Sequence, residues 1–327
     1  MRIGINGLGR IGRGLFRTLA SDGRVQVAAV NDVADASITA HLLRHDSYYG
    51  AWEGVSLDGD GRLRVEGRAI PFTHETSPDR IPWGDSGVQW VVEATGKFKT
   101  RRALEAHGLP VLLTAASPEA DRQVVFGVNH GSIAPSDRIL SAASCTTHCV
   151  APPLAVLAER FDVLSALFNT VHCYNVGQTL VDAPQKDARR ARAGALNLIP
   201  TTTSASLAIE AVLPALAGRV QGMAVRVPAP AVSLTELTVH TARPASAREA
   251  NDALREAAEG RLMGVLAVSE EPLVSQDFLG NTASSIVDLP LTQAADGMLR
   301  IIAWYDNEWG YINRLVDLLA FLKEMGP

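Results

Sequence analysis

The first third of the chain alternates short apolar runs with segments whose apolar residues recur at helical spacing. Several of these runs are continuous rather than alternating, which is typical of strands buried on both faces of a parallel sheet. A strand, a helix and a second strand in this order favour an α/β domain. The expected strands lie at 2–6, 25–31, 88–93 and 111–115, and the expected first helix lies at 10–20.

The pattern changes after Cys145. One helical segment is followed by long strand candidates with few helices between them, and this order favours an antiparallel sheet in a second domain. The segment at 51–74 is typical of short antiparallel strands joined by turns, and the polar, basic stretch at 175–197 is expected to form a long ordered loop. The expected helices lie at 146–160 and 311–324, and the expected strands at 163–174, 220–227, 232–241 and 298–305.

Length and composition agree with a folded protein of two domains. A chain of 327 residues is large for one hydrophobic core, and 47% hydrophobic with 20% charged residues fits neither disorder nor a fibrous repeat. The net charge of -5 provides no global basic field, so nucleic acid is not an expected partner. No apolar run approaches the roughly 20 residues of a membrane helix. Three scattered cysteines are typical of a reducing compartment, and we therefore expect a cytoplasmic protein.

A glycine-rich motif follows the first expected strand and opens the first expected helix. Gly7, Gly9 and Gly12 form a G-x-G-x-x-G pattern, which permits a tight turn and brings a helix N-terminus to a pyrophosphate. Asp32 lies 20 residues beyond Gly12, where its carboxylate can accept ribose hydroxyls and repel a 2′-phosphate. The motif therefore predicts a Rossmann-type site for NAD, against the alternative of a glycine turn that only joins a strand to a helix.

A cysteine at the start of a helix is the candidate nucleophile. Cys145 directly precedes the helical segment at 146–160, and the dipole and free N–H groups of a helix N-terminus lower the pKa of a thiol. His172 follows one helix and one strand later, and the chain can fold back to pair its imidazole with the thiolate and to exchange protons with a substrate oxygen. Residues and spacing alone leave three alternatives open: a small buried cysteine, a structural histidine and a metal ligand. The four-residue step from Cys145 to Cys149 does not match a zinc knuckle.

The residues around the candidate nucleophile read Ser144-Cys145-Thr146-Thr147-His148-Cys149. This segment closely resembles the active-site signature of glyceraldehyde-3-phosphate dehydrogenases. The resemblance covers essentially the whole chain, from the glycine motif to the C-terminal helix, and its motifs are specific. It includes the segments at 6–12, 93–98, 127–130, 188–192, 225–228 and 304–311.

The resemblance implies a reaction that passes through a thioester. Cys145 would attack an aldehyde, His172 would act as base and hold the developing oxyanion, and hydride would pass to a nicotinamide held by Asn307. Inorganic phosphate would then cut the thioester, so that glyceraldehyde 3-phosphate, phosphate and NAD give 1,3-bisphosphoglycerate and NADH. The residues expected at the cofactor are Asn6, Gly7, Gly9, Arg10, Ile11, Gly12, Asp32, Thr95, Gly96, Asn307 and Tyr311.

The resemblance also implies two anion sites. Arg226 matches the arginine that holds the substrate's own phosphate, and Arg190 matches a group that serves the attacking phosphate, with a structural ion pair as the alternative for each. The loop at 174–197 matches the family's tetramer interface, so a homotetramer is expected, and Pro184 with Asp32 matches the family's NAD-type pattern. The residues expected at the substrate and phosphate are Ser144, Thr146, Asn175, Arg190, Thr203, Ser204 and Arg226.

Several positions depart from the family pattern, mostly around the substrate phosphate. The family usually has lysine where this chain has Leu207, glycine at Ser204 and asparagine at His148. Leu207 cannot replace a cation, and Ser204 adds bulk where a phosphate approaches closely. Two hypotheses follow: neutral drift in an ordinary member of the family, or a changed substrate such as erythrose 4-phosphate or a specialised acyl phosphate. The other departures are Asn175 for threonine, Gly177 for aspartate, Gln185 for histidine and Ala231 for asparagine.

The expected architecture is α/β, with a Rossmann-type dinucleotide-binding domain and an α+β catalytic domain around a mainly antiparallel sheet. We expect the NAD-binding domain at 1–144, completed by the C-terminal helix at 307–327, and the catalytic domain at 145–306. Neither a metal nor a membrane partner is expected. A non-catalytic, NAD-sensing protein is the hypothesis from another functional class, and the joint presence of Cys145, His172 and Asn307 argues against it.

Overall fold

The structure, a computed structural model, describes residues 1–60 and 62–326. The chain divides into two compact units. Unit 1 contains residues 1–124, 130–143 and the chain from residue 312 onward, and unit 2 contains residues 125–129 and 144–311. Pro327, the last position of the expected C-terminal helix, lies outside the described residues. No helix in the described part of the chain is long and apolar enough to span a membrane.

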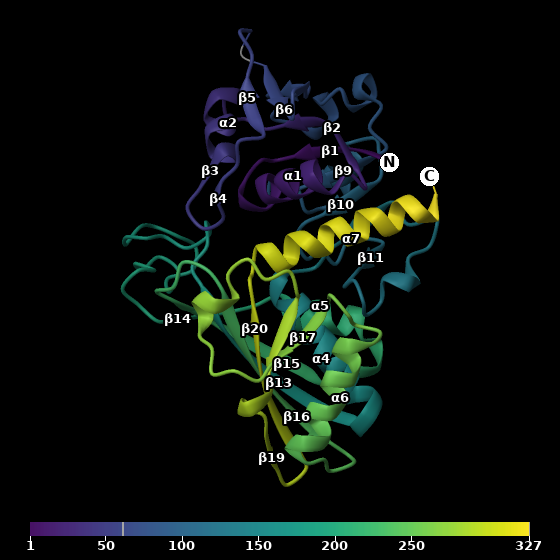
Figure 1. The fold of residues 1–327 in the computed structure, drawn as a ribbon, viewed down its shortest axis with the longest axis vertical. Helices are drawn as coiled ribbons and strands as arrows, with labels where there is room; N and C mark the ends of the chain where they lie inside the picture. The colour runs from purple at the N-terminus through teal and green to yellow at the C-terminus, as the bar shows by residue number, and fades with distance from the viewer. Residues whose placement is uncertain (61, 327) are drawn as a thin grey trace. The chain divides into compact units, whose positions relative to one another are not determined.

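Unit 1 is built on a seven-stranded sheet with the order β11-β12-β10-β9-β1-β2-β8 (Figure 1). Every neighbouring pair in this sheet is parallel, which confirms the α/β class predicted for this part of the chain. The strands are β1 (Arg2–Asn6), β2 (Gln26–Asn31), β8 (Phe72–Thr73), β9 (Trp90–Glu93), β10 (Val111–Leu113), β11 (Arg122–Gln123) and β12 (Ile139–Ser141). The helices are α1 (Arg10–Asp22), α2 (Ala36–Arg44), α3 (Arg101–Glu105) and most of α7 (Trp309–Met325).

The continuous apolar runs of the sequence form the central strands of this sheet. Ile3 and Ile5 of β1 and Val91 and Val92 of β9 have no exposed surface. Successive residues of a strand point to opposite faces, so a run that is buried throughout requires cover on both faces. The glycine loop and Asp32 follow β1 and β2 directly, at the carboxyl ends of the strands, where open α/β sheets bind ligands.

The segment at 51–74 is only partly the antiparallel appendage that the sequence predicts. Strands β5 (Val55–Leu57), β6 (Leu63–Val65) and β7 (Arg68–Ala69) form a three-stranded antiparallel sheet. However, β8 pairs in parallel with β2 and extends the main sheet. The hydroxyl of Thr73 donates to Oδ1 of Asn31 at 2.7 Å and helps to hold β8 there. A further short pair, β3 (His45–Asp46) with β4 (Gly50–Ala51), precedes this segment.

Unit 2 is built on an eight-stranded sheet with the order β14-β15-β13-β16-β20-β18-β17, with β19 also paired to β20. The β13–β15 and β17–β18 pairs are parallel and the others are antiparallel, so the predicted mainly antiparallel sheet is confirmed. The strands are β13 (Val163–Cys173), β14 (Ile199–Thr201), β15 (Val220–Val227), β16 (Ser233–Thr241), β17 (Leu266–Ser269), β18 (Ser285–Asp288), β19 (Gln293–Ala295) and β20 (Met298–Tyr305). The helices are α4 (Cys145–Phe161), α5 (Ala205–Val212) and α6 (Ala247–Glu259). Short 3₁₀ turns in the two units lie at Pro78–Arg80, Trp83–Ser86, His130–Ser132, Pro214–Leu216, Ser275–Phe278 and Leu289–Leu291.

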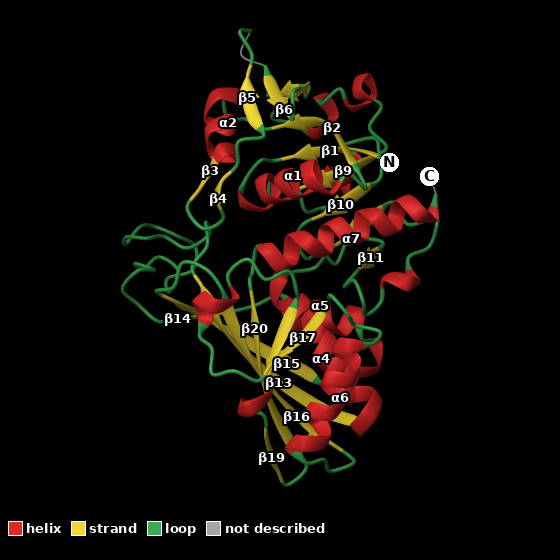
Figure 2. Ribbon diagram, viewed as in Figure 1, coloured by secondary structure: helices red, strands yellow, loops and turns green. Residues whose placement is uncertain are grey.

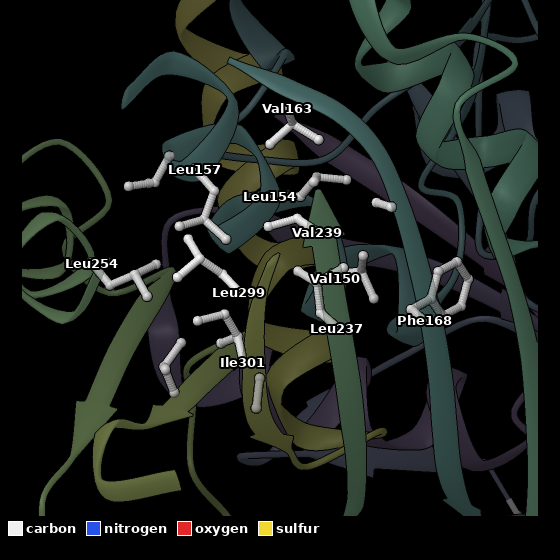
Figure 3. Close-up of a cluster of buried hydrophobic side chains, with 14 of the residues drawn as sticks. Val150, Leu154, Leu157, Val163, Phe168, Leu237, Val239, Leu254, Leu299 and Ile301 are labelled. Carbon is white, nitrogen blue, oxygen red and sulfur yellow. The ribbon is translucent and has the colours of Figure 1, made fainter. Parts of the chain in front are cut away.

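The helices of unit 2 cover one face of its sheet (Figure 2). Helix α4 packs against both α5 and α6, and its apolar side chains meet those of β13, β16 and β20 in one core (Figure 3). Every second residue near the end of β13 is buried in this direction: Phe168, Thr170 and His172. His172 therefore lies on the face of the sheet that the helices cover.

The chain between β13 and β14 forms neither helix nor strand across residues 174–198, as predicted for 175–197. It is nevertheless held by hydrogen bonds, because the Nε2 atom of Gln178 donates to the carbonyl oxygens of Arg190 at 3.1 Å and Arg192 at 2.8 Å. This long loop also exposes apolar surface. The large apolar side chains exposed on it include Val176, Val181, Leu196 and Leu198.

Candidate active site

The candidate nucleophile and base meet because α4 begins on the face of the sheet that His172 occupies. Cys145 is the first residue of α4, and its Sγ atom lies 3.6 Å from Nε2 of His172. His172 is only 4% exposed, whereas Cys145 is partly exposed. The thiol can therefore meet a substrate while the imidazole behind it is held by the protein.

Ser144 fixes the start of α4. Its Oγ atom accepts a hydrogen bond from the backbone N–H of Thr147 at 3.2 Å, so Ser144 is the N-cap residue of the helix. The remaining N–H groups of the first turn favour negative charge at this end of the helix. The sequence places Ser144 near the substrate, and the structure gives it this capping role beside Cys145.

Strand register brings Arg226 beside His172. The two residues are paired across the neighbouring strands β13 and β15. The Nη1 atom of Arg226 lies 2.5 Å from Nδ1 of His172 and 2.8 Å from the carbonyl oxygen of Cys173, and Nδ1 lies 2.7 Å from that same carbonyl. Nδ1 can donate to the carbonyl or accept from Arg226, but not both. Only the first arrangement leaves Nε2 of a neutral imidazole able to accept the proton of Cys145.

The pKa shifts at this site run in the opposite direction to those expected for the predicted thiolate–imidazolium pair. Burial raises the pKa of the Cys145 thiol, and the opposing effects of Arg226 and the backbone N–H of Thr146 do not overcome it. Burial and the charge of Arg226 lower the pKa of His172 to about 3. Both pKa shifts favour a neutral thiol and a neutral imidazole over the predicted thiolate–imidazolium pair. Desolvation outweighs the helix terminus, and Arg226 repels a second positive charge on the imidazole.

Tyr305, which the sequence does not single out, joins the two elements that carry the pair. It ends β20, and its buried hydroxyl lies 3.1 Å from Oγ1 of Thr146 and 2.7 Å from Oγ1 of Thr170. Thr146 follows Cys145 in α4, and Thr170 lies two residues before His172 on the same face of β13. Tyr305 thus ties the first turn of α4 to β13. The hydroxyl of Thr146, expected at a phosphate, is engaged with Tyr305 here.

A second polar group gathers at the start of α5. The Nε atom of Arg190 donates to Oγ1 of Thr201 at 2.7 Å, and Oγ1 of Thr203 accepts the first N–H of α5 at 3.2 Å. Burial lowers the pKa of Arg226, and the nearby charge of Arg190 lowers it further. Arg190, Thr203 and Arg226, all expected at an anion, therefore lie in one region of unit 2.

Two other expected residues are not brought to the pair. Ser204 precedes α5 without capping it with its side chain, and it is exposed. Asn175 is also exposed, and its Oδ1 atom accepts the N–H of Gly177 at 3.0 Å. In the described part of the chain, no hydrogen bond joins Ser204 or Asn175 to Cys145 or His172.

The glycine loop of unit 1 has the geometry of a phosphate-binding turn. A Cβ atom on Gly7 (φ +97°) would lie 2.6 Å from the backbone nitrogen of Thr95, and one on Gly12 would lie 1.9 Å from the carbonyl oxygen of Gly7. In contrast, a Cβ on Gly9 would meet no protein atom within 4 Å. No described side chain caps α1 at Gly9, and Ile11 follows in the first turn. Open space beside uncapped N–H groups is suited to an anion.

Asp32 and Arg10 both contact neighbouring groups of the protein. Asp32 is half-buried, and its Oδ2 atom accepts the backbone N–H of Leu8 at 2.6 Å. The guanidinium of Arg10 lies 2.5 Å from a carboxylate oxygen of Asp46 and 4.7 Å from the ring centre of Tyr48. Asp32 is thus held at the glycine loop, whereas the side chain of Arg10 is directed towards Asp46.

A buried glutamate orients residues around the glycine loop, and sequence reasoning missed this role. Glu93 ends β9 and has no exposed surface. Its Oε2 atom accepts from Nδ2 of Asn6 at 2.6 Å and lies 3.2 Å from Nε2 of His107, and its Oε1 atom accepts the N–H of Thr95 at 2.8 Å. Two expected cofactor residues, Asn6 and Thr95, are therefore held by one carboxylate. Gly96 follows with φ +70° and open space around it.

Asn307 and Tyr311 come from the turn between β20 and α7 and from the first turn of α7. Asn307 is 8% exposed, and its Oδ1 atom accepts the S–H of Cys173 at 3.0 Å. Tyr311 is buried, and its ring meets that of His148 edge-on with centroids 5.4 Å apart. Asp306 holds the turn, because its Oδ1 atom accepts the N–H of Trp309 at 2.8 Å.

Comparison with known proteins agrees with this arrangement. A family model described as "Glyceraldehyde 3-phosphate dehydrogenase, NAD binding domain" matches residues 1–101, and one described as "Glyceraldehyde 3-phosphate dehydrogenase, C-terminal domain" matches residues 144–307. The chain is 44% identical over 333 residues to the glyceraldehyde-3-phosphate dehydrogenase of Geobacillus stearothermophilus, covering 100% of this chain and 99% of the relative. It is 46% identical over 334 residues to glyceraldehyde-3-phosphate dehydrogenase 1 of Bacillus subtilis, with the same coverage of 100% and 99%. The chain belongs to the glyceraldehyde-3-phosphate dehydrogenase family.

Membership of the glyceraldehyde-3-phosphate dehydrogenase family confirms the resemblance, and the family consists of NAD-dependent oxidoreductases. The NAD-binding match includes the glycine loop and Asp32, and the C-terminal match includes Cys145, His172 and Arg226. Across residues 1–60 and 62–326, no cluster of three or more His, Cys, Asp or Glu side chains is arranged to hold a metal ion.

The positions that depart from the family pattern lie in different surroundings. His148 is fully buried in the first turns of α4, whereas Leu207 is 72% exposed on α5. Gly177 and Gln185 are exposed in the long loop, and Ala231 is buried after β15. The missing cation at Leu207 therefore leaves an apolar side chain at the surface close to the start of α5.

Proposed function

We propose that this chain is a phosphorylating glyceraldehyde-3-phosphate dehydrogenase that oxidises its aldehyde with NAD through a thioester on Cys145. The observation that carries the proposal is the 3.6 Å approach of the Cys145 Sγ atom to Nε2 of His172 at the start of α4. Full-length similarity to relatives that bear this name supports the substrate and the reaction.

The residues of unit 1 fit a dinucleotide. The open space beside Gly9 and the uncapped start of α1 suit a pyrophosphate. The carboxylate of Asp32, held at the loop by the N–H of Leu8, suits ribose hydroxyls and disfavours a 2′-phosphate. When bound, NAD supplies the acceptor for hydride. We assign NAD binding to residues 1–144 with the C-terminal helix, and the chemistry to residues 145–306.

The chemistry starts from the neutral thiol and the neutral imidazole. As the Sγ atom of Cys145 bonds to the aldehyde carbon, Nε2 of His172 takes the thiol proton, and the imidazolium then stabilises the negative oxygen. Hydride leaves the same carbon while the oxygen's electron pair forms the C=O bond of the thioester. An oxygen of inorganic phosphate next attacks the thioester carbon, and the C–S bond breaks. The leaving sulfur of Cys145 takes back the proton that His172 holds, and the proton of the attacking phosphate is released to solvent.

Arg226 is proposed to hold the phosphate of the substrate, and Arg190 with Thr203 is proposed to serve inorganic phosphate. Two guanidinium groups in one region of unit 2 support this assignment, because planar, multiple N–H donors suit phosphate oxygens. Movement of Arg226 towards an anion would also end its competition for Nδ1 of His172 and leave Nε2 as the proton acceptor. The further candidates at the substrate are Ser144, Thr146, Asn175 and Ser204.

A homotetramer in the cytoplasm is proposed as the working form. The apolar side chains exposed on the long loop between β13 and β14 support burial against another subunit. The three free cysteines support a reducing compartment. Sedimentation velocity tests the assembly, and a species with the mass of a single chain at micromolar concentration would contradict it.

The test of the reaction is NADH formation from glyceraldehyde 3-phosphate, with and without inorganic phosphate. Turnover that requires phosphate or arsenate is expected, and the Cys145→Ser variant should lose turnover while it binds NAD normally. A rate independent of phosphate would indicate hydrolysis of the thioester instead. Normal turnover by the variant would remove Cys145 from the mechanism.

A second candidate function is the oxidation of another phosphorylated aldehyde. It is supported by the departures from the family pattern at the start of α5. There the exposed Ser204 and the exposed Leu207 stand where the family has glycine and lysine. This candidate predicts a lower kcat/KM for glyceraldehyde 3-phosphate than for erythrose 4-phosphate or another phosphorylated aldehyde in the same assay, with unchanged NAD affinity.

A further inference from the structure

The thiol of Cys173 takes no part in the proposed reaction, yet it contacts a residue expected at the cofactor. Cys173 ends β13, has no exposed surface, and its Sγ atom lies 3.0 Å from Oδ1 of Asn307. Its distance to Nδ1 of His172 is longer, at 3.7 Å, and that nitrogen already has the Cys173 carbonyl at 2.7 Å. The thiol of Cys173 therefore donates its hydrogen bond to Oδ1 of Asn307.

We propose that Cys173 is a positioning residue that fixes which end of the Asn307 amide is presented to the nicotinamide. The inference rests on the proposed function and on the role that the family resemblance implies for Asn307, which is to hold the nicotinamide carboxamide. A thiol donates and an amide oxygen accepts, so this contact holds Oδ1 towards β13 and turns Nδ2 away from Cys173. Asn307 is then a donor to its ligand and not an acceptor.

The proton that makes Cys173 a donor is firmly held. Burial raises the pKa of the Cys173 thiol to about 12. The backbone is fixed as well, because the N–H of Cys173 donates to Oγ of Ser233 at 3.2 Å. On the other side, the carboxylate of Asp306 holds the turn that carries Asn307. Both partners of the contact are therefore held in place before any ligand arrives.

The nitrogen of the Asn307 side-chain amide remains available to a ligand. No hydrogen bond within the described residues uses Nδ2 of Asn307, although the residue is only 8% exposed. Without the thiol, the amide can rotate by half a turn and present oxygen in place of N–H. A ligand must then select one of two orientations, and the preorganised donor is lost.

The test compares ligand affinities of the full-length chain by calorimetry. Cys173→Ala removes the donor and should weaken NAD by about 2- to 10-fold, the range of one modest hydrogen bond. Cys173→Ser restores a donor and should return the Kd to within about twofold of the unaltered chain. Cys149→Ala is the matched control, because it removes another fully buried thiol of unit 2, whose Sγ atom lies 3.8 Å from Oγ of Ser285. Its Kd for NAD should not change.

ADP-ribose, which lacks the nicotinamide, separates positioning from general damage. Its affinity should be the same for the unaltered chain and for Cys173→Ala. Equal NAD affinity of these two proteins would overturn the inference, and so would a parallel loss of ADP-ribose binding or a Cys173→Ser variant as weak as Cys173→Ala. If the unaltered chain binds neither ligand, the proposed function itself fails, which is distinct from failure of the Cys173 contact alone.

Discussion

Replacement of Glu93 by glutamine should destabilise unit 1, although the two side chains have the same shape. The carboxylate is fully buried and acts only as an acceptor, for Asn6 and His107 at Oε2 and for Thr95 at Oε1. Glutamine replaces one acceptor oxygen with an NH₂ group. With the amide oxygen towards Thr95, that NH₂ group faces the side chains of Asn6 and His107, which also donate.

Neither neighbour can reverse its role without a further conflict. His107 can move its proton to Nδ1, but Nδ1 accepts from the indole N–H of Trp83 at 3.1 Å, and an indole nitrogen only donates. Asn6 can turn its amide, but its Oδ1 accepts from Asn31 at 2.9 Å, and Oδ1 of Asn31 accepts the backbone N–H of Glu75 at 2.8 Å. Both ends of the network are therefore groups that cannot become acceptors.

The expected loss of stability follows from the number of buried donors that are left without an acceptor. Two buried donors, Nδ2 of Asn6 and Nε2 of His107, lose their acceptor, which costs about 1–3 kcal/mol each. Glutamine does not bury a charge, and this offsets part of the cost. We expect the free energy of unfolding to fall by about 2–4 kcal/mol in urea, followed by tryptophan fluorescence at one protein concentration. NAD should also bind more weakly, because Asn6 and Thr95 lose their common anchor.

Glu105→Gln is the matched control for this substitution. Glu105 lies in the same unit at the end of α3, is exposed, and pairs with Arg101 one helical turn away. Its replacement should cost less than about 0.5 kcal/mol. If Glu93→Gln is no less stable than Glu105→Gln, the network does not need a carboxylate and the hydrogen-bond reasoning is refuted.

Three further predictions concern Tyr305 between α4 and β13, the glycine loop of unit 1, and the thiol of Cys145. Tyr305→Phe should lower kcat by about tenfold with little change in the Kd for NAD, because the hydroxyl that bonds to both Thr146 of α4 and Thr170 of β13 is lost. An unchanged kcat would show that this link between α4 and β13 is dispensable. Gly9→Ala should weaken NAD binding at an unchanged Tm, whereas Gly12→Ala should weaken NAD binding and also lower the Tm. The reason is that only the Cβ atom at position 12 collides with protein atoms. Equal Tm values for the two variants would contradict this. Burial raises the pKa of Cys145, so alkylation of the chain without NAD should still be accelerating where an ordinary thiol is already ionised, with no inflection from His172, whose pKa is about 3. An alkylation rate that is already constant at neutral pH would indicate a thiolate instead.

The sequence predicted those features that depend only on residues close together in the chain. The glycine loop follows one strand and opens one helix, so its role can be read from a dozen residues. Cys145 starts a helix, which is equally local. Helix α6 was not among the expected helices, although Ser246 and Glu249 have the spacing of a capping box, which the structure forms.

The contacts that sequence reasoning missed depend on strand order and register. Glu93 meets His107 only because β9 ends beside the segment after α3, and nothing in the spacing of the two residues indicates it. Cys173 meets Asn307 across 134 positions of sequence. The pKa directions of Cys145 and His172 also depend on the tertiary structure, because burial is the largest cause of both shifts. For His172 the charge of Arg226, which the parallel pairing of β13 with β15 brings to the imidazole, adds to the effect of burial.

That pairing links anion binding to the strength of the base. Arg226 is in direct contact with Nδ1 of His172 at 2.5 Å, so its charge opposes an imidazolium more strongly than it favours a thiolate on the far side of the ring. An anion that draws Arg226 away or neutralises it should therefore raise the pKa of His172 more than that of Cys145, and proton transfer from Sγ to Nε2 becomes easier. At high concentration and in the absence of substrate, inorganic phosphate that occupies the place of the substrate phosphate at Arg226 should then accelerate alkylation of Cys145 near neutral pH at constant ionic strength. An alkylation rate that does not respond to phosphate would show that Arg226 does not restrain the base.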